Sequence, residues 1–139
     1  MTDLLPDTEG GCRTWLRSLA TVTTHVAQRV FFAVPDDADE TDYPLITVSR
    51  VGGGPDTSDA PIDAAVLQLK VHGTRRGKTV ARTIAGVLWS EFRGIEGPLT
   101  WSSGIQCHGA AVESMIYMED PVDSRPSYTL TVSAQVSSV

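Results

Sequence analysis

The residues with the clearest chemical potential stand together at positions 73–79, Gly-Thr-Arg-Arg-Gly-Lys-Thr. An alternating apolar run precedes them and a helix-like run follows, which is the order of parts in a phosphate-binding loop. Such a loop needs four residues between its first glycine and the Gly-Lys-Ser/Thr end, because their amides wrap a phosphate. Only three residues separate Gly73 from Gly77. The pattern favours a strand-to-helix turn over a nucleotide-binding enzyme built on Gly77-Lys78-Thr79, which stays an alternative.

The same turn gathers positive charge around the start of the expected helix, with Arg75, Arg76, Lys78 and Arg82. Helix N-termini favour anions, so a phosphate or DNA contact is one interpretation. The chain as a whole carries a net charge of −6. We therefore favour an ion-pair surface that meets an acidic partner, such as the acidic loop of another copy.

That acidic loop is Asp-Asp-Ala-Asp-Glu-Thr-Asp, residues 36–42. Oxygen ligands recur at Asp37, Asp39 and Thr41, a spacing that calcium sites also use. An EF-hand loop counted from Asp37 would need a glycine at its sixth position and an acid at its twelfth. Those positions hold Asp42 and Val48. The segment is predicted to be a solvated, exposed loop.

The remaining reactive side chains form no catalytic pattern. His25, His72 and His108 lack the spacing of a zinc-binding helix, and Cys107 and His108 are adjacent residues that point to opposite faces of a strand. Ser102 has no base that the sequence identifies, and no nucleophile-elbow motif is present. We expect no enzymatic activity, no cofactor and no metal.

Length and composition bound the class of protein. The chain has 139 residues, 41% apolar and 20% charged, which predicts one globular domain over residues 1–139. A sequence pI near 4.9 argues against general binding to nucleic acid. No apolar run is long enough to span a bilayer, and the first residues lack a signal-peptide pattern. Two distant cysteines predict a reduced intracellular setting.

The first half of the chain predicts one helix and three strands. Residues 1–10 are expected to be a loose arm. A helix is expected from about Cys12 to Gln28, because Trp15, Leu19, Val22 and Val26 form one apolar stripe. Strands are expected over residues 30–34, 43–51 and 64–72, with a long flexible loop over 52–62.

The second half predicts one helix and two strands. Lys78 to Phe92 is expected to be a helix that buries Val80, Ile84, Val87, Leu88 and Phe92. Residues 104–119 and 127–136 are expected to be strands, the second with Tyr128, Leu130, Val132, Ala134 and Val136 on one face. The order α-β-β-β-α-β-β predicts an α+β fold, with two helices on a largely antiparallel sheet of four to five strands.

Four stretches resemble the tail terminator (tail completion) proteins of long-tailed double-stranded DNA phages, in the style of actinobacterial phages. They are "RVFFAVPDD", "YPLITVSRVGGGP", "AAVLQLKVHGTRRGKTVARTIAGVLWSEF" and "SRPSYTLTVSAQV". The resemblance spans about residues 12–137 and rests on the pattern of elements, with no signature catalytic residue.

The resemblance implies a non-enzymatic virion protein, made in the host cytoplasm and located at the head–tail junction. Such proteins form a hexameric ring on the tail tube protein, end tail polymerisation and meet a head-completion or neck protein. Genomic DNA passes through the channel without sequence-specific binding, and no membrane is involved. Another neck or head-completion protein is the nearest alternative.

A ring of like subunits needs two different complementary patches on each copy. We expect the loop at 52–62 and the acidic loop on one side, and the basic helix start on the other. The candidate residues are Asp36, Asp37, Asp39, Glu40, Arg50, Gly52, Gly53, Gly54, Pro55, Asp56, Arg75, Arg76, Lys78 and Arg82.

Overall fold

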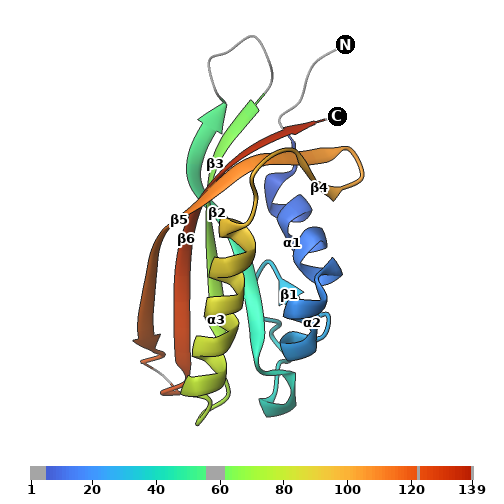
Figure 1. Cartoon of the computed structure of the whole chain (residues 1–139). Coiled ribbons are helices and arrows are strands. Elements are labelled where there is room, and N and C mark those ends of the chain that lie inside the picture. Colours follow the sequence, from blue (N-terminus) through green and yellow to red (C-terminus); the bar gives the residue numbers. More distant parts are fainter. Residues whose placement is uncertain (1–5, 56–61, 122, 139) are drawn as a thin grey trace.

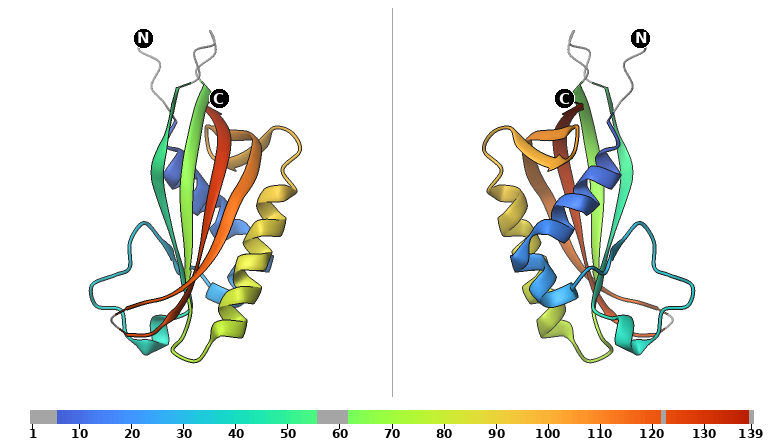
Figure 2. Two further views of the ribbon diagram at one scale, coloured as in Figure 1. Left: turned by 90° about the vertical axis from the view of Figure 1, so that its left-hand side faces the viewer. Right: turned by 90° about the vertical axis from the view of Figure 1, so that its right-hand side faces the viewer.

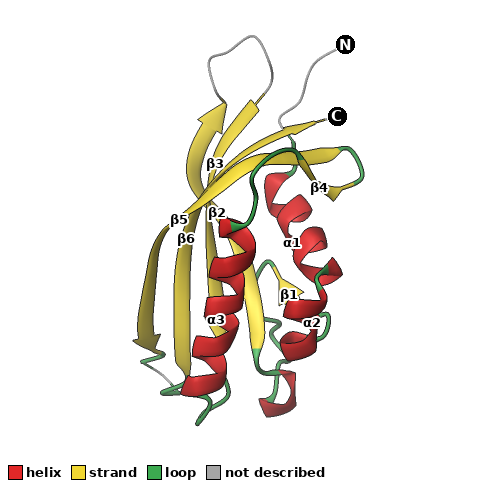
Figure 3. Cartoon of the chain, in the orientation of Figure 1, coloured by secondary structure: helices red, strands yellow, loops and turns green. Residues whose placement is uncertain are grey.

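Three helices cover one face of a single six-stranded sheet in the computed structural model, which describes residues 6–55, 62–121 and 123–138 (Figures 1 and 3). The α+β class is therefore confirmed. The strands are β1 (Val30–Phe31), β2 (Leu45–Pro55), β3 (Ile62–His72), β4 (Leu99–Ser102), β5 (Ile105–Glu119) and β6 (Pro126–Ser138). Their spatial order is β1-β2-β3-β6-β5-β4, and every pair is antiparallel except β1 with β2.

The sheet has more strands than the four to five expected. The additional strand β4 pairs Leu99 with Cys107 and Thr100 with Gln106, at the start of β5. The tight turn between them holds Gly104 at φ +80°, a conformation that glycine adopts without strain. At the other edge, the strand expected over 30–34 is confirmed only for Val30 and Phe31, which pair with Ile46 and Thr47.

The single helix expected from about Cys12 to Gln28 is wrong, because the structure has two helices, α1 (Thr8–Ser18) and α2 (Ala20–Val26). They are separated by Leu19, whose backbone is extended (φ −89°, ψ 118°). The Ser18 hydroxyl donates to the Trp15 carbonyl at 2.6 Å, and the Leu19 amide bonds to Leu16 instead. This local competition for a helical acceptor explains the break.

The expected loose arm is also shorter than predicted. α1 begins at Thr8, and the Asp7 carboxylate caps it by accepting from the Gly10 amide at 3.0 Å. Residues 1–5 of that arm lie outside the described residues.

The flexible loop expected over 52–62 is wrong for Gly52, Gly53, Gly54 and Pro55, which continue β2 and pair with Val66 to Asp63 of β3. A bulge at Val51 shifts the register. Gly53 lies at φ +82°, and a Cβ there would sit 2.1 Å from the Ala64 carbonyl oxygen. Backbone geometry thus requires a glycine at this position. Asp56 lies outside the described residues.

The helix α3 (Lys78–Arg93) matches the prediction within one residue. Ile84, Leu88 and Phe92 are buried as expected, but Val80 is 46% exposed and that assignment is wrong. The buried stripe is centred on Ala81 and Ala85 instead, whose small side chains let the helix lie close to the sheet.

The core lies between the helices and one face of the sheet. Tyr128, Leu130, Val132, Ala134 and Val136 of β6 are all buried there, as predicted. Trp15 of α1 stacks on Trp101 of β4 at 5.5 Å between ring centroids, and Phe92 of α3 meets Trp15 edge-on at 5.1 Å. The side views in Figure 2 show that all three helices lie on this face, so the sheet's second face carries none.

Candidate functional site

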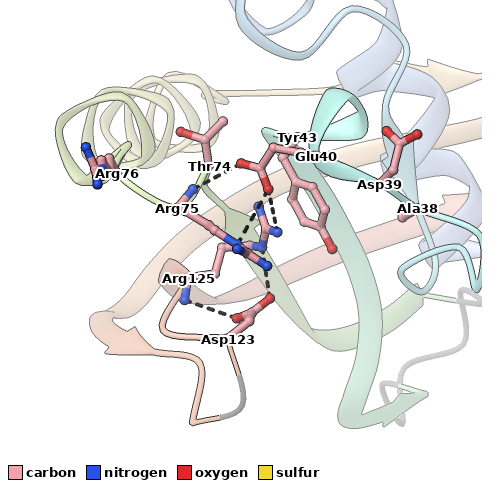
Figure 4. Close-up of a pocket in the computed structure, with 9 residues that line it drawn as sticks. All are labelled: Ala38, Asp39, Glu40, Tyr43, Thr74, Arg75, Arg76, Asp123 and Arg125. Atoms are coloured by element: carbon pink, nitrogen blue, oxygen red, sulfur yellow. Dashed lines mark hydrogen bonds and ion pairs between the residues drawn. The ribbon is translucent and has the colours of Figure 1, made fainter.

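Charged side chains from three distant segments converge at one end of the sheet (Figure 4). The segments are the loop that ends in a 3-10 turn, η1 (Glu40–Asp42), the turn between β3 and α3, and the turn between β5 and β6. Together they line an open depression of about 680 Å³. We call the residues Glu40, Tyr43, Arg75, Asp123 and Arg125 the end cluster.

Arg125 lies at the centre of the end cluster and is only 7% exposed. Its guanidinium donates to Glu40 Oε2 at 2.8 Å, to Asp123 Oδ2 at 3.0 Å and to the Gly73 carbonyl at 3.3 Å. It also lies 3.7 Å from the centre of the Tyr43 ring. One side chain thereby connects all three segments, with charge-assisted bonds and a cation–π contact.

The electrostatics follow from these contacts. The hydrogen bond from Arg125 lowers the pKa of Glu40, and bonds from the backbone and side chain of Arg125 lower the pKa of Asp123. Burial alone would lower the pKa of Arg125, but its bonds to the two carboxylates outweigh that effect and raise it. Glu40, Asp123 and Arg125 are therefore stabilised in their ionised forms.

The acidic loop is more ordered than a solvated run of charges. The Asp39 carboxylate accepts from the Thr41 amide at 2.9 Å, and Asp42 accepts from the Asp39 amide at 2.9 Å, which forms a capping box around η1. A hydrogen bond from the Thr41 hydroxyl is the main cause of a lowered pKa at Asp39. Asp36 and Asp37 are exposed.

The structure brings the acidic loop and the basic helix start together within one chain. The Arg75 amide donates to Glu40 Oε1 at 3.3 Å, and its Nε lies 3.8 Å from Glu40 Oε2. Both lie at the opposite end of the sheet from Gly52–Pro55 (Figure 1). The acidic loop was expected to share one side of the subunit with the 52–62 segment. The structure instead places it beside the basic helix start, at the other end of the sheet from Gly52–Pro55.

The other basic residues of this turn have different surroundings. Lys78 Nζ lies 4.3 Å from the centre of the Tyr117 ring on β5. Arg76 and Arg82 are exposed, and Figure 4 shows Arg76 outside the hydrogen-bonded network. Among the described residues at this end of the sheet, Arg76 and Arg82 are therefore the cations available to bind a partner protein.

The turn at 73–77 does not form a phosphate cradle. The Gly73 amide donates to the Pro126 carbonyl at 2.9 Å, the Gly77 amide to the Thr74 carbonyl at 3.0 Å, and the Arg75 amide to Glu40. The Glu40 carboxylate thus accepts a hydrogen bond from the Arg75 amide, a donor that a phosphate-binding loop would need for its phosphate. The strand that enters the turn has antiparallel neighbours on both sides, unlike the parallel sheets of phosphate-loop proteins.

A second ionic cluster holds α1 against the hairpin of β2 and β3. Arg50 makes a bidentate contact with the buried carboxylate of Asp63, with Nη2 at 2.6 Å from Oδ1. The Thr8 hydroxyl donates to Asp63 Oδ2 at 2.6 Å, and Glu9 accepts from the Arg50 amide at 2.7 Å. Burial would raise the pKa of Asp63, but its bonds from Arg50 and Thr8 lower it. Arg50 therefore acts within its own chain.

The remaining candidate groups are held inside the fold. His72 Nε2 lies 3.1 Å from the Thr47 hydroxyl, and burial lowers its pKa to about 4. Cys12 and Cys107 are free buried thiols, and burial raises the pKa of Cys107 to about 11. Within the described ranges, no group of three or more His, Cys, Asp or Glu side chains is arranged to hold a metal ion. Over the same ranges, no helix is long and apolar enough to cross a membrane.

The sequence analysis missed Arg125, Asp123 and Tyr43. The signal for Asp123 and Arg125 was a turn, Asp-Ser-Arg-Pro, directly before an alternating strand. A turn of that composition is common at strand ends, so nothing in it marks the arginine as buried.

Comparison with known proteins places the fold. No protein-family model matches the chain, and no curated protein matches it. A solved structure described as "Virion of native gene transfer agent (GTA) particle" contains a chain with a TM-score of 0.62 and 16% sequence identity. The alignment covers 94% of this chain and 98% of that chain. The two chains thus share one α+β fold over nearly their whole lengths.

Proposed function

We propose that this chain is a structural protein of a phage-like virion. The observation that carries the proposal is the fold likeness to a chain of a gene transfer agent virion, which leaves almost no residues of either chain unmatched. A fold shared over nearly the whole length of both chains supports a place for this chain among virion structural proteins.

Within the virion, we propose that the chain is a tail terminator. It forms a hexameric ring on the tail tube, ends tail polymerisation and presents the surface that meets the head-completion or neck protein. The sequence resemblance over about residues 12–137 supports this finer assignment. DNA would pass through the ring without sequence-specific contacts, which suits an acidic chain of net charge −6.

The ring needs two different patches on each subunit. The two ends of the sheet supply candidates, because Arg76 and the acidic loop lie at one end and Gly52–Pro55 at the other. The contacts of Arg125 keep the first end rigid, which lowers the conformational entropy that assembly would cost. Arg50 and Lys78 belong to the proposed interface mainly through the segments that they hold in place.

Imaging tests the proposal. Purified protein is examined by negative-stain microscopy alone and with tail tubes, and an antibody or gold label locates it on intact particles. We expect six-membered rings and a label at the head–tail junction. A label at the head vertex would favour another neck protein, and a monomer that binds ATP with magnesium would overturn the structural role.

A further inference from the structure

The outer edge of β5 is open along its second half. β4 pairs with β5 only from Ile105 to Cys107, and no other described strand lies on that side. Register shifts occur near His108 and Glu113, after which Ser114–Glu119 pairs regularly with β6. The last residues of β5 therefore form a straight edge with unpaired outward backbone groups.

This open edge is also apolar. Met115, Ile116 and Met118 are 39%, 54% and 57% exposed, the last two being among the most exposed large apolar side chains described. Natural proteins usually protect a regular sheet edge with charges, bulges or covering segments. Between Met115 and Met118 the edge carries no charged residue and no bulge interrupts its pairing with β6, so pairing with another strand would stabilise it.

The opposite edge of the sheet is protected. β1 covers β2 at Ile46 and Thr47, and the Glu9 carboxylate accepts from the outward amide of Arg50. The bulge at Val51 then distorts the strand. Because β2 offers no straight edge, head-to-tail extension of the sheet from β5 of one copy to β2 of the next is disfavoured.

We propose that two copies of this chain pair through β5, antiparallel, about a two-fold axis at Ile116. In this register Ile116 faces Ile116 of the second copy on the helix-free side of the sheet. On the other side, Met115 faces Tyr117 of the second copy, since both residues share the face of Leu130 and Tyr128. The pairing covers Met115, Ile116 and Tyr117 with apolar side chains, places Met118 opposite Ser114 of the second copy, and forms one sheet across both copies.

The charges agree with this register. Glu113 comes opposite Glu119 of the second copy, but the two carboxylates lie on different faces. Glu113 accepts from Ser133 on the helix-free side, at 2.8 Å, whereas Glu119 accepts from the Tyr117 hydroxyl at 3.4 Å. The side of α3 above Tyr117 carries Lys78 and, one turn on, Arg82. Glu119 of the second copy therefore approaches a basic surface.

The dimer is a form of the protein outside the virion and does not depend on the proposed function. A two-fold contact of identical edges closes on itself and cannot propagate. For a protein that also assembles on a template, this contact covers the most aggregation-prone edge until assembly.

Sedimentation equilibrium over a range of concentrations tests the dimer. Wild-type protein is expected to be a dimer at high concentration. Ile116→Lys places two like charges at the axis and should raise the dissociation constant about tenfold or more. Val51→Lys is the matched control, because Val51 is also 54% exposed but lies on β2, and it should leave the constant unchanged. Protein that stays monomeric at every concentration, or equal weakening by both variants, would overturn the proposal.

Cross-linking provides an independent measurement if Ile116→Lys does not fold. Directly opposite residues of antiparallel strands have Cα atoms about 4.5–5.5 Å apart, which suits a disulfide. Ile116→Cys should form a covalent dimer on mild oxidation, and Val51→Cys should not. The native Cys12 and Cys107 are 0% exposed and do not compete. An Ile116→Cys protein that dimerises without cross-linking, or that forms only hexamers, would refute the two-fold register. Neither result bears on the position of the protein in a virion.

Discussion

Arg125 donates a 2.8 Å hydrogen bond to the carboxylate of Glu40, across 85 positions of the sequence. The arginine directly precedes β6, and the glutamate begins the 3-10 turn before β2. This pair joins the two halves of the chain at the end of the sheet where α3 begins. The same end carries Arg76 and Arg82, the exposed cations of the proposed ring interface.

Replacing Arg125 should destabilise the protein. Arg125→Ala removes bonds to Glu40, Asp123 and the Gly73 carbonyl together with the Tyr43 contact. A loss of about 1–3 kcal/mol in the free energy of unfolding is expected, measured by urea denaturation. The exposed Arg75→Ala should cost less than about 0.5 kcal/mol. Equal losses in both variants would contradict a special role for Arg125.

Stability should rise with pH between about 4 and 6.5 because of His72. Burial and the nearby Lys70 lower its pKa to about 4 in the fold, from an ordinary value of 6.5, against opposing effects of Asp120 and Asp123. The unfolded chain binds more protons in this window, so the stabilisation is complete above pH 6.5 and is lost as pH falls. Thermal unfolding of wild type and His72→Gln across this range measures it. The variant should show the flatter curve, and parallel curves would contradict the assignment.

Two neighbouring glycines should respond differently to alanine. Gly53→Ala forces a side chain into φ +82° and towards the Ala64 carbonyl, with an expected cost of about 1–3 kcal/mol. Gly54 has no atom within 4 Å of an added Cβ, so Gly54→Ala should be nearly neutral. Urea denaturation compares the two. If Gly54→Ala is as destabilising as Gly53→Ala, close backbone packing is not the reason for the glycine at position 53.

The buried stripe of α3 predicts a contrast within one helix. Leu88 is fully buried, and Leu88→Ala should cost about 2–5 kcal/mol in the free energy of unfolding. Val80 is largely exposed, so Val80→Ala should change it by less than about 0.5 kcal/mol. A large loss at Val80 would show that the helix is rotated from the position described.

Charge reversal tests the proposed ring surface. Arg76→Glu should weaken ring formation with little effect on folding, because Arg76 is exposed and lies outside the end-cluster network. Arg93→Glu is the matched control, with the same charge change at the other end of α3. Negative-stain particle counts and thermal unfolding measure the two effects. Rings that survive Arg76→Glu would remove this arginine from the interface.

Local patterns predicted a large part of the fold. The alternation of Tyr128, Leu130 and Val132 identified β6 and its buried face, because a strand's side chains alternate in every context. The helical stripe of Ile84, Leu88 and Phe92 identified α3 to within one residue for the same kind of reason. For the site, the acidic loop and the basic helix start were recognised as charged surfaces, but not as neighbours.

Local sequence patterns were thus sufficient for the α+β class, the faces of the regular elements and the positions of exposed charge, since each depends on residues a few positions apart. The break at Leu19 follows from the local bond of the Ser18 hydroxyl to the Trp15 carbonyl. By contrast, the strand at Gly52–Pro55 and the central place of Arg125 are set by the tertiary structure. Each of these depends on contacts between distant segments. A glycine is required at position 53 because the Ala64 carbonyl of β3 lies against it. The buried charge of Arg125 is balanced by the carboxylate of Glu40, in the first half of the chain.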